Sequence, residues 1–246
     1  MLRGSKALVT GASRGIGYAI AKELVSAGAA VTIVGRNTET IEKAARELGE
    51  NVQYLTWDVA ELERADELIA SAAERMGGLD ILVNNAGIFA QRGEWTADSL
   101  LQTTVDEWER VMRINTSAIF CNMGAAVRYF RAHGIEGNIL NVTSVAGAEP
   151  VFGAYGASKI AATGLTRGWG KMFAPEKIVI NGIAPGPVAT EMNHWHDGDP
   201  MENSRIPFGR YATIEEVGKL AMYLLDECAV MTCGEVVTFD GGYAIR

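Results

Sequence analysis

The chain has 246 residues, 48% of them hydrophobic, and carries a net charge of −8 from 22 basic and 30 acidic residues. This length and apolar content allow one large hydrophobic core, and no repeat, low-complexity run or linker-like segment divides the chain. An acidic chain without a basic stripe is not expected to bind nucleic acid.

Apolar runs alternate with helical patterns along the whole chain. We expect strands at residues 7–9, 30–34, 52–56, 79–83, 138–142, 178–181 and 235–239. We expect helices at residues 16–27, 41–48, 62–75, 105–132, 155–173 and 213–225, the last capped by Thr213. Apolar strands that alternate with helices predict a parallel sheet covered on both faces. The sequence therefore predicts an α/β fold, a doubly wound parallel sheet (Rossmann fold) of about seven strands in one domain over residues 1–246.

The cysteines and the start of the chain bear on its location. Cys121, Cys228 and Cys233 are odd in number and form no Cys-x-x-Cys pair, which favours reduced thiols over a disulfide framework. The chain runs directly from Met1 into the first strand, without a signal peptide or a stretch long enough to span a bilayer. We therefore expect a cytoplasmic protein with no membrane partner.

A glycine-rich segment, Thr10-Gly11-Ala12-Ser13-Arg14-Gly15-Ile16-Gly17, joins the first strand to the first helix. Glycines allow a tight turn and close approach of the backbone to a pyrophosphate, and the helix N-terminus offers unpaired N–H groups to an anion. The spacing is Gly-x-x-x-Gly-x-Gly rather than the commoner Gly-x-Gly-x-x-Gly. The expected cofactor-binding residues here are Gly11, Ser13, Arg14, Gly15, Ile16 and Gly17.

The end of the second strand bears on the choice of cofactor. A dinucleotide without a 2′-phosphate usually meets an acidic residue there, but this strand ends in Val34-Gly35-Arg36-Asn37. Arg36 and Arg14 would suit a dianionic phosphate, because a guanidinium binds it bidentately. Alternatively, Arg14 points into water. We expect NADP(H) rather than NAD(H), with Arg36 and Asn37 among the cofactor-binding residues.

Two further strand ends carry candidate nucleotide contacts. Asp58, followed by Val59, could accept a hydrogen bond from the adenine amino group or could cap the helix ahead of Leu62. The segment Asn84-Asn85-Ala86-Gly87 could line the adenine ribose or could form a turn. Val59, Asn85, Ala86 and Gly87 are expected cofactor-binding residues alongside Asp58.

Tyr155 and Lys159 lie four residues apart on a predicted helix and therefore share one face. An ammonium beside a phenol favours the phenolate and lowers the pKa of the phenol, which suits general acid–base catalysis. Ser144, at the end of the fifth strand, could hold a substrate carbonyl, although by itself it is an ordinary turn serine. Asn115 lies in the middle of a predicted helix, where asparagine is disfavoured without a reason.

These motifs, in this order and with Pro185-Gly186-Pro187-Val188-Ala189-Thr190, resemble the short-chain dehydrogenase/reductase family. The similarity covers essentially the whole chain and is greatest to members of the 3-oxoacyl-acyl-carrier-protein reductase type, partly through the ending Phe239-Asp240-Gly241-Gly242-Tyr243. The loop between Ser144 and Tyr155 is shorter than is commonest in this family.

The resemblance implies roles for individual residues. Tyr155 would be the general acid or base, Lys159 would lower its pKa and bind the nicotinamide ribose, and Ser144 would polarise the substrate oxygen. Asn115 would hold a water in a proton relay. The nicotinamide would be held by the segment with Pro185, Gly186, Val188 and Thr190, and both Tyr155 and Lys159 would also contact the cofactor.

The family also implies an NADP(H)-dependent homotetramer that interconverts a small-molecule carbonyl and a secondary alcohol, with thioester-bound 3-oxoacyl groups among the candidate substrates. We expect residues 88–95 and a substrate lid at residues 188–210 to close over the substrate. Arg205 and Arg210 of the lid could attract an anionic group or could be solvated loop charges. Its His194-x-His196-Asp197-x-Asp199 run has metal-ligand residue types, but its flexible context predicts no metal site.

Two other functions fit parts of the pattern. Gly11-Ala12-Ser13-Arg14-Gly15 matches the Gly-x-Ser-x-Gly elbow of serine hydrolases, with His133, His194 and His196 as possible bases. A non-catalytic NADP(H) sensor or scaffold would need the binding glycines alone.

Overall fold

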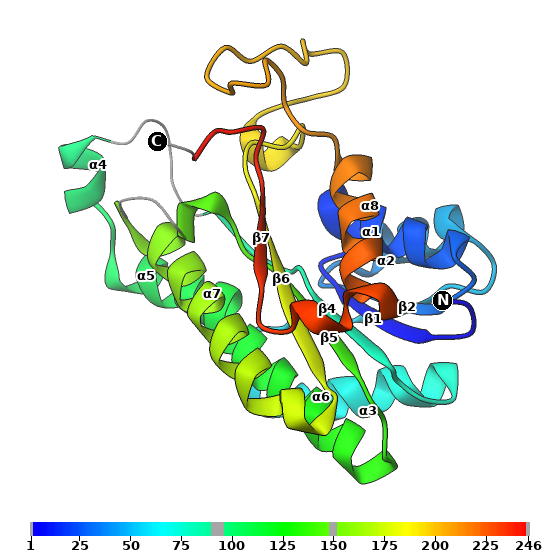
Figure 1. Ribbon diagram of the computed structural model, residues 1–246. Coiled ribbons are helices and arrows are strands. Elements are labelled where there is room, and N and C mark those ends of the chain that lie inside the picture. Colours follow the sequence, from blue (N-terminus) through cyan, green and yellow to red (C-terminus); the bar gives the residue numbers. More distant parts are fainter. Residues whose placement is uncertain (1, 90–95, 148–151, 245–246) are drawn as a thin grey trace.

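The computed structural model describes residues 2–89, 96–147 and 152–244. Within these residues, seven strands form one parallel sheet in the order β3-β2-β1-β4-β5-β6-β7 (Figure 1). The strands are β1 (Lys6–Thr10), β2 (Ala30–Gly35), β3 (Gln53–Thr56), β4 (Ile81–Asn84), β5 (Asn138–Val142), β6 (Val179–Pro185) and β7 (Val236–Phe239). The predicted fold class, a doubly wound parallel sheet, is confirmed.

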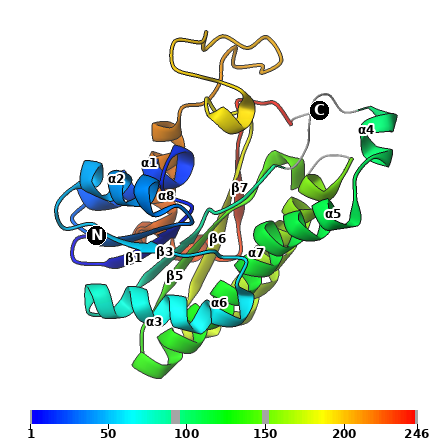
Figure 2. The same ribbon diagram turned by 180° about the vertical axis from the view of Figure 1, so that it is seen from behind.

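Helices cover both faces of this sheet (Figures 1 and 2). One face carries α1 (Gly15–Ser26), α2 (Thr38–Leu48) and α8 (Ile214–Leu225), and the other carries α3 (Ala65–Met76), α6 (Ala118–His133) and α7 (Ala154–Phe173). Side chains of successive strand residues enter opposite cores, as period-2 alternation requires. Val9 and Ile33 pack toward α1 and α8, whereas Leu8 and Val34 pack toward α3 and α6.

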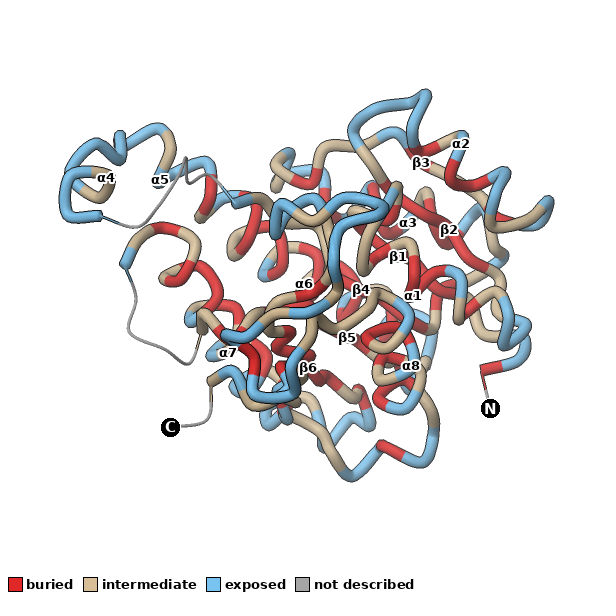
Figure 3. Tube along the Cα trace, turned by 90° about the horizontal axis from the view of Figure 1, so that it is seen from above, coloured by how far each residue is buried: buried red, intermediate tan, exposed pale blue. Residues whose placement is uncertain are grey.

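The strand order reverses between β1 and β4, which pair with each other although β2 and β3 separate them in the chain. Ligands of such sheets bind beyond the carboxyl ends of the strands at this reversal. The glycine-rich segment follows β1 and the Asn84–Gly87 segment follows β4, so both lie at this position. Seen from above, buried strands occupy the centre and exposed loops surround them (Figure 3).

The helix predicted at 105–132 is present but is not regular. It consists of α5 (Val105–Met112), a π-helical turn (Arg113–Ser117) and α6, and it is preceded by the short α4 (Ala97–Leu101). A π turn inside an α-helix adds one residue and often marks a functional site. Asn115 lies in this turn, which is why an asparagine is tolerated there.

The start of α8 is as predicted. Thr213 caps the helix, accepting a hydrogen bond from the Glu216 N–H while the Glu216 carboxylate accepts from the Thr213 N–H. Before this cap, the chain from Val188 makes an exposed excursion beyond the carboxyl edge of the sheet (Figure 1), and Ile206 within it is buried. In the described residues, no helix has the length and apolar character needed to cross a membrane.

Candidate active site

The turn between β1 and α1 is built from glycines that admit no side chain. Gly11 and Gly15 have φ of +64° and +62°, a region that favours glycine. A Cβ on Gly17 would lie 2.3 Å from Nδ2 of Asn85, and one on Gly11 would lie 2.7 Å from Cα of Ala86. The N-terminus of α1 has no side-chain cap and no acidic residue in its first turn. These features fit a pyrophosphate, which would accept hydrogen bonds from the free N–H groups.

Asn85 holds this turn against the end of β4. Its Nδ2 donates to the carbonyl oxygens of Thr10, at 3.0 Å, and Gly11, at 2.9 Å. The buried Thr10 hydroxyl accepts hydrogen bonds from the N–H groups of Asn85 and Ala86. The Asn85 side chain therefore stabilises the glycine turn. This role differs from the expected contact with the adenine ribose.

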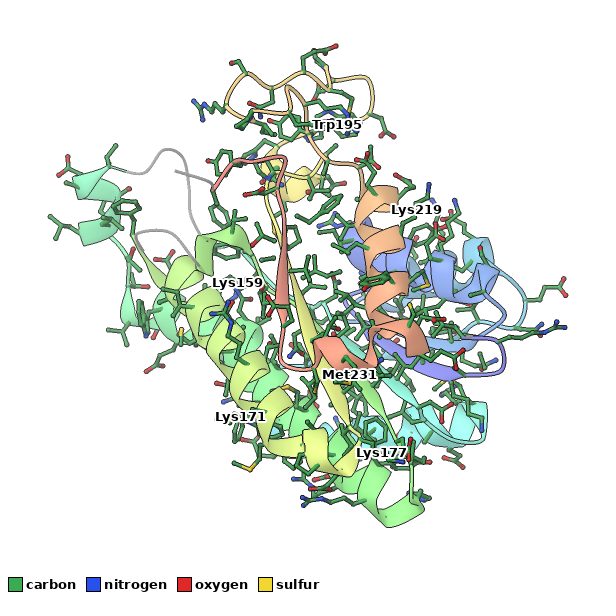
Figure 4. The ribbon with its side chains drawn as sticks, in the orientation of Figure 1. Lys159, Lys171, Lys177, Trp195, Lys219 and Met231 are labelled. Atoms are coloured by element: carbon green, nitrogen blue, oxygen red, sulfur yellow. The ribbon has the colours of Figure 1, made fainter. Side chains whose placement is uncertain are left out.

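Tyr155, Lys159 and Ser144 come together at the ends of β5 and α7. The Ser144 hydroxyl shares a hydrogen bond with the Tyr155 hydroxyl. Lys159 is only 4% exposed, and its Nζ donates to the Val142 carbonyl at 3.0 Å. The same Nζ lies 5.6 Å from the centroid of the Tyr155 ring. Figure 4 marks Lys159 on α7, one helical turn after Tyr155.

The electrostatics of this group differ from the expectation in one respect. Burial raises the pKa of Tyr155, and the hydrogen bond from Ser144 opposes this increase only in part. Burial also lowers the pKa of Lys159 to about 8. Lys159 is not among the causes of the Tyr155 shift, and the lowering of the Tyr155 pKa by Lys159 stays a prediction. Nζ lies over the Tyr155 ring and donates its hydrogen bond to the Val142 carbonyl.

Asn115 connects the π turn to the end of β4 and to α7. Its Nδ2 donates to the Ile88 carbonyl, at 2.9 Å, and to the Ser158 hydroxyl, at 3.1 Å. Its Oδ1 accepts from the Ile88 N–H at 2.8 Å. A Cβ on Gly87 would lie 3.4 Å from Asn115 Oδ1 and 3.7 Å from Lys159 Nζ, so the two side chains flank this glycine.

The segment after β6 returns to the glycine turn. The Thr190 methyl group would be 3.9 Å from a Cβ on Gly15, and the Thr190 hydroxyl donates to the Val188 carbonyl at 3.4 Å. Gly186, next to Pro185 at the end of β6, packs so closely on Asp240 that a Cβ there would lie 2.5 Å from the aspartate Cβ. The Asp240 carboxylate accepts hydrogen bonds from the N–H groups of Gly242 and Ala244. These bonds close the turn that follows β7.

A family model described as short chain dehydrogenase matches residues 5–199. The chain belongs to the short-chain dehydrogenase family. It is 34% identical to gluconate 5-dehydrogenase of Gluconobacter oxydans, over 99% of this chain and 96% of that protein. It is 33% identical to the 3-oxoacyl-acyl-carrier-protein reductase FabG of Aquifex aeolicus, over 98% of each.

A solved structure agrees with this assignment. The fold of this short-chain dehydrogenase matches that of a 3-ketoacyl-(acyl-carrier-protein) reductase from Brucella melitensis complexed with NADH, with a TM-score of 0.89 and 29% identity. The match covers 100% of both chains. The resemblance inferred from the motifs is confirmed, including the similarity to reductases of 3-oxoacyl groups.

In this short-chain dehydrogenase the two candidate phosphate-binding arginines differ. Arg14 forms an ion pair with Glu191, and the side chains are 75% and 59% exposed. Arg36 is exposed and has no ion-pair partner among the described residues. The Arg14 side chain is largely exposed, as one alternative expected, and its guanidinium also pairs with the Glu191 carboxylate. Glu191 was not singled out in the sequence, where it lies 177 residues from Arg14.

Three other candidate cofactor residues have roles within the protein. The Asn37 side chain caps α2, accepting from the Thr40 N–H at 2.9 Å. One carboxylate oxygen of Asp58 accepts from the Ala60 N–H at 2.9 Å, forming a turn rather than the cap ahead of Leu62. Val59 is buried in a small cluster with Ile114. The Asn37 side chain is thus used within α2, whereas the second Asp58 oxygen has no hydrogen bond among the described residues.

Residues 188–210, the predicted lid, contain one fixed point and one exposed arm. Arg210 makes a bidentate contact with Glu216, at 2.6 and 2.9 Å, so it is tied to α8 and is not a solvated loop charge. Arg205 is exposed. Trp195 donates from Nε1 to the Pro200 carbonyl at 3.2 Å, and it lies in the exposed arm above the sheet (Figure 4). Within the described residues no cluster of three potential metal ligands occurs.

The substrate side of the site is described in part. Residues 90–95 of the expected segment 88–95, and residues 148–151 of the loop after Ser144, lie outside the described residues. Phe89 is described, and it contacts Tyr155 edge-to-face with ring centroids 4.8 Å apart. This contact, like Thr10 and Glu191, was missed in the sequence. An aromatic residue two positions after Gly87 was the available signal.

Proposed function

We propose that this protein is an NADP(H)-dependent oxidoreductase that interconverts a carbonyl group and a secondary alcohol. The observation that carries the proposal is the joined Ser144 and Tyr155 hydroxyls above a buried lysine, next to a glycine turn suited to a pyrophosphate. The family and the relatives with dehydrogenase and reductase names support it. The bound nicotinamide would supply the hydride.

The side chains of this protein would bind the substrate oxygen and transfer the proton. In reduction, negative charge grows on the substrate oxygen, and the hydroxyls of Tyr155 and Ser144 donate hydrogen bonds to it. Tyr155 then gives up its phenolic proton to that oxygen, and in oxidation it takes the proton back. Burial raises the pKa of Tyr155, so the phenol is protonated at neutral pH, as the acid in reduction must be, but it is a weaker acid than an exposed tyrosine. Lys159 would bind the nicotinamide ribose, and Asn115 would keep the Ile88 backbone in place beside it.

The choice of NADP(H) over NAD(H) rests on the second strand. The strand β2 ends without an acidic side chain, and exposed Arg36 follows it with a free guanidinium among the described residues. Arg14 would join Arg36 on the 2′-phosphate by exchanging Glu191 for the phosphate. The proposed contacts to the rest of the cofactor come from Asp58, Val59, Ala86, Gly87, Pro185, Gly186, Val188 and Thr190.

We also propose a domain organisation, a location, an oligomeric state and a substrate class. The chain would be one cofactor-binding domain with a substrate lid at about 188–210, located in the cytoplasm. Exposed apolar side chains on α5, α6 and α7 suit an interface between copies and support a homotetramer; they are Trp108, Phe120, Ile160 and Met172. Thioester-bound 3-oxoacyl groups are a candidate substrate because of the named relatives.

Replacement of Tyr155 by Phe tests this function. We expect kcat with a ketone found by screening a carbonyl panel with NADPH to fall by about 10²- to 10⁴-fold. Binding of NADPH, followed by fluorescence titration, should be unchanged and tighter than binding of NADH. The matched control is Tyr223→Phe, which changes an exposed tyrosine on α8.

Other outcomes would support the alternatives. A non-catalytic sensor would be favoured by two results together. The parent protein would turn over no carbonyl, and the Tyr155→Phe variant would keep full activity in a regulatory or binding assay. Stoichiometric labelling of Ser13 by a serine-directed phosphonate would favour a hydrolase. Among the described residues, no histidine forms a hydrogen bond with Ser13, which speaks against a hydrolase.

A further inference from the structure

Phe89 places a large apolar side chain beside the proposed acid. Its ring is 36% exposed, yet it lies edge-to-face against Tyr155 with an interplanar angle of 78°. Such aromatic pairs have a preferred geometry, so each ring restricts the orientation of the other. The exposed part of Phe89 is apolar surface that gains free energy when another apolar group covers it.

The backbone that carries Phe89 is firmly held. Both the N–H and the carbonyl of the preceding residue, Ile88, are bonded to the Asn115 side chain. Asn115 is itself fully buried and bonded to Ser158 on α7. Phe89 is therefore presented from a fixed position, as a residue must be if it is to select among substrates.

The polar and apolar groups around Tyr155 are separated in space. The Ser144 hydroxyl meets the phenolic oxygen, whereas Phe89 meets the ring. A carbonyl oxygen held by Ser144 and Tyr155 would thus have an aromatic wall next to one of its substituents. That wall offers no hydrogen bond to a hydroxyl group and would desolvate it without compensation.

We propose that Phe89 is a specificity-determining residue that contacts the substituent next to the substrate carbonyl and favours alkyl or aryl ketones over polyhydroxylated ones. This inference rests on the proposed function. Contact with Phe89 would strengthen the binding of the carbon-rich substituent and would leave the hydrogen bonds to the carbonyl oxygen unchanged.

The test uses a series of open-chain ketones, 2-butanone, 2-pentanone and 2-hexanone, together with the polyhydroxylated four-carbon ketone erythrulose. For the parent protein with NADPH, we expect kcat/KM to rise roughly threefold per added methylene. In Phe89→Ala this increase should disappear, while activity with erythrulose changes less than twofold. Phe89→Leu, which keeps an apolar side chain, should retain part of the increase. Tyr223→Ala, an exposed aromatic residue replaced on α8, is the matched control and should behave as the parent.

The outcomes separate the inference from the function on which it depends. If the parent reduces none of these ketones or any other carbonyl, the proposed function fails. If the parent is active but Phe89→Ala keeps the same increase per methylene, the inference is overturned. It is also overturned if all substrates lose activity equally and the pH profile shifts, because Phe89 would then act only by positioning Tyr155.

Discussion

At the scale of single residues, Lys159 is unusual because it is a buried lysine. Its Nζ donates a hydrogen bond to the Val142 carbonyl, and burial lowers its pKa to about 8 from an ordinary 10.5. A lysine with a lowered pKa makes folding less favourable while it is charged in the folded state. This cost is fully present below pH 8 and disappears as the pH rises toward 10.5.

Replacement of Lys159 by Met should therefore remove a pH dependence of stability. Between pH 7.5 and 9.5 the parent protein should gain about 2 kcal/mol in free energy of unfolding relative to Lys159→Met. Urea unfolding of both proteins at the two pH values measures this difference. Lys171→Met changes an exposed lysine of the same helix and is the control. Parallel stability curves for the parent and Lys159→Met would contradict the assigned burial.

At the scale of elements, the lid depends on the start of α8. The Arg210 guanidinium and the Thr213 N–H both bond to the Glu216 carboxylate, and these bonds lower its pKa to about 2. A lowered carboxyl pKa adds stability that is present above about pH 4.5, the ordinary value, and is lost as the pH falls toward 2. The lid base should therefore stay fixed at neutral pH and loosen in acid.

Replacement of Glu216 by Gln should detach the lid base at every pH. We expect the protein to lose about 1 kcal/mol of stability and the KM for a ketone substrate to rise several-fold with a smaller change in kcat. Limited proteolysis should cut residues 191–212 faster in this variant. Glu215→Gln, an exposed neighbour in the same helical turn, is the control. Equal KM values and equal cleavage rates in the two variants would show that the contact does not fix the lid.

Element prediction failed where the chain departs from a regular period. The helix expected at 105–132 contains a π turn at Arg113–Ser117, and one inserted residue does not visibly disturb the apolar pattern. The strands were found because their apolar runs are buried on both sides, as Leu8 and Val9 illustrate. Asn115, an unlikely residue for a helix interior, was the sequence sign of the irregular turn.

At the scale of the whole molecule, the order of the motifs was enough to predict the sheet and the edge where the candidate residues meet. Contacts between distant segments were not predictable in the same way. The ion pair of Arg14 with Glu191 and the contact of Phe89 with Tyr155 depend on how loops return over the sheet. Neither loop has a period or a capping pattern that specifies its path. The side-chain roles of Asn85 and Asn37 were also missed, because an amide can bond to a ligand or to the backbone equally well.

The central proposal is that Tyr155 and Ser144 hold a substrate carbonyl beside the glycine turn, where a bound nicotinamide dinucleotide would supply hydride. The most direct measurement follows deuterium from NADPH labelled at C4 of the nicotinamide into the alcohol product, by mass spectrometry and NMR. With one of the two C4-deuterated epimers of NADPH, we expect one deuterium on the carbinol carbon of the product. In Tyr155→Phe, the deuterated product should appear more slowly, in proportion to the decrease in kcat. Product alcohol that carries no deuterium from either C4 epimer would contradict the account.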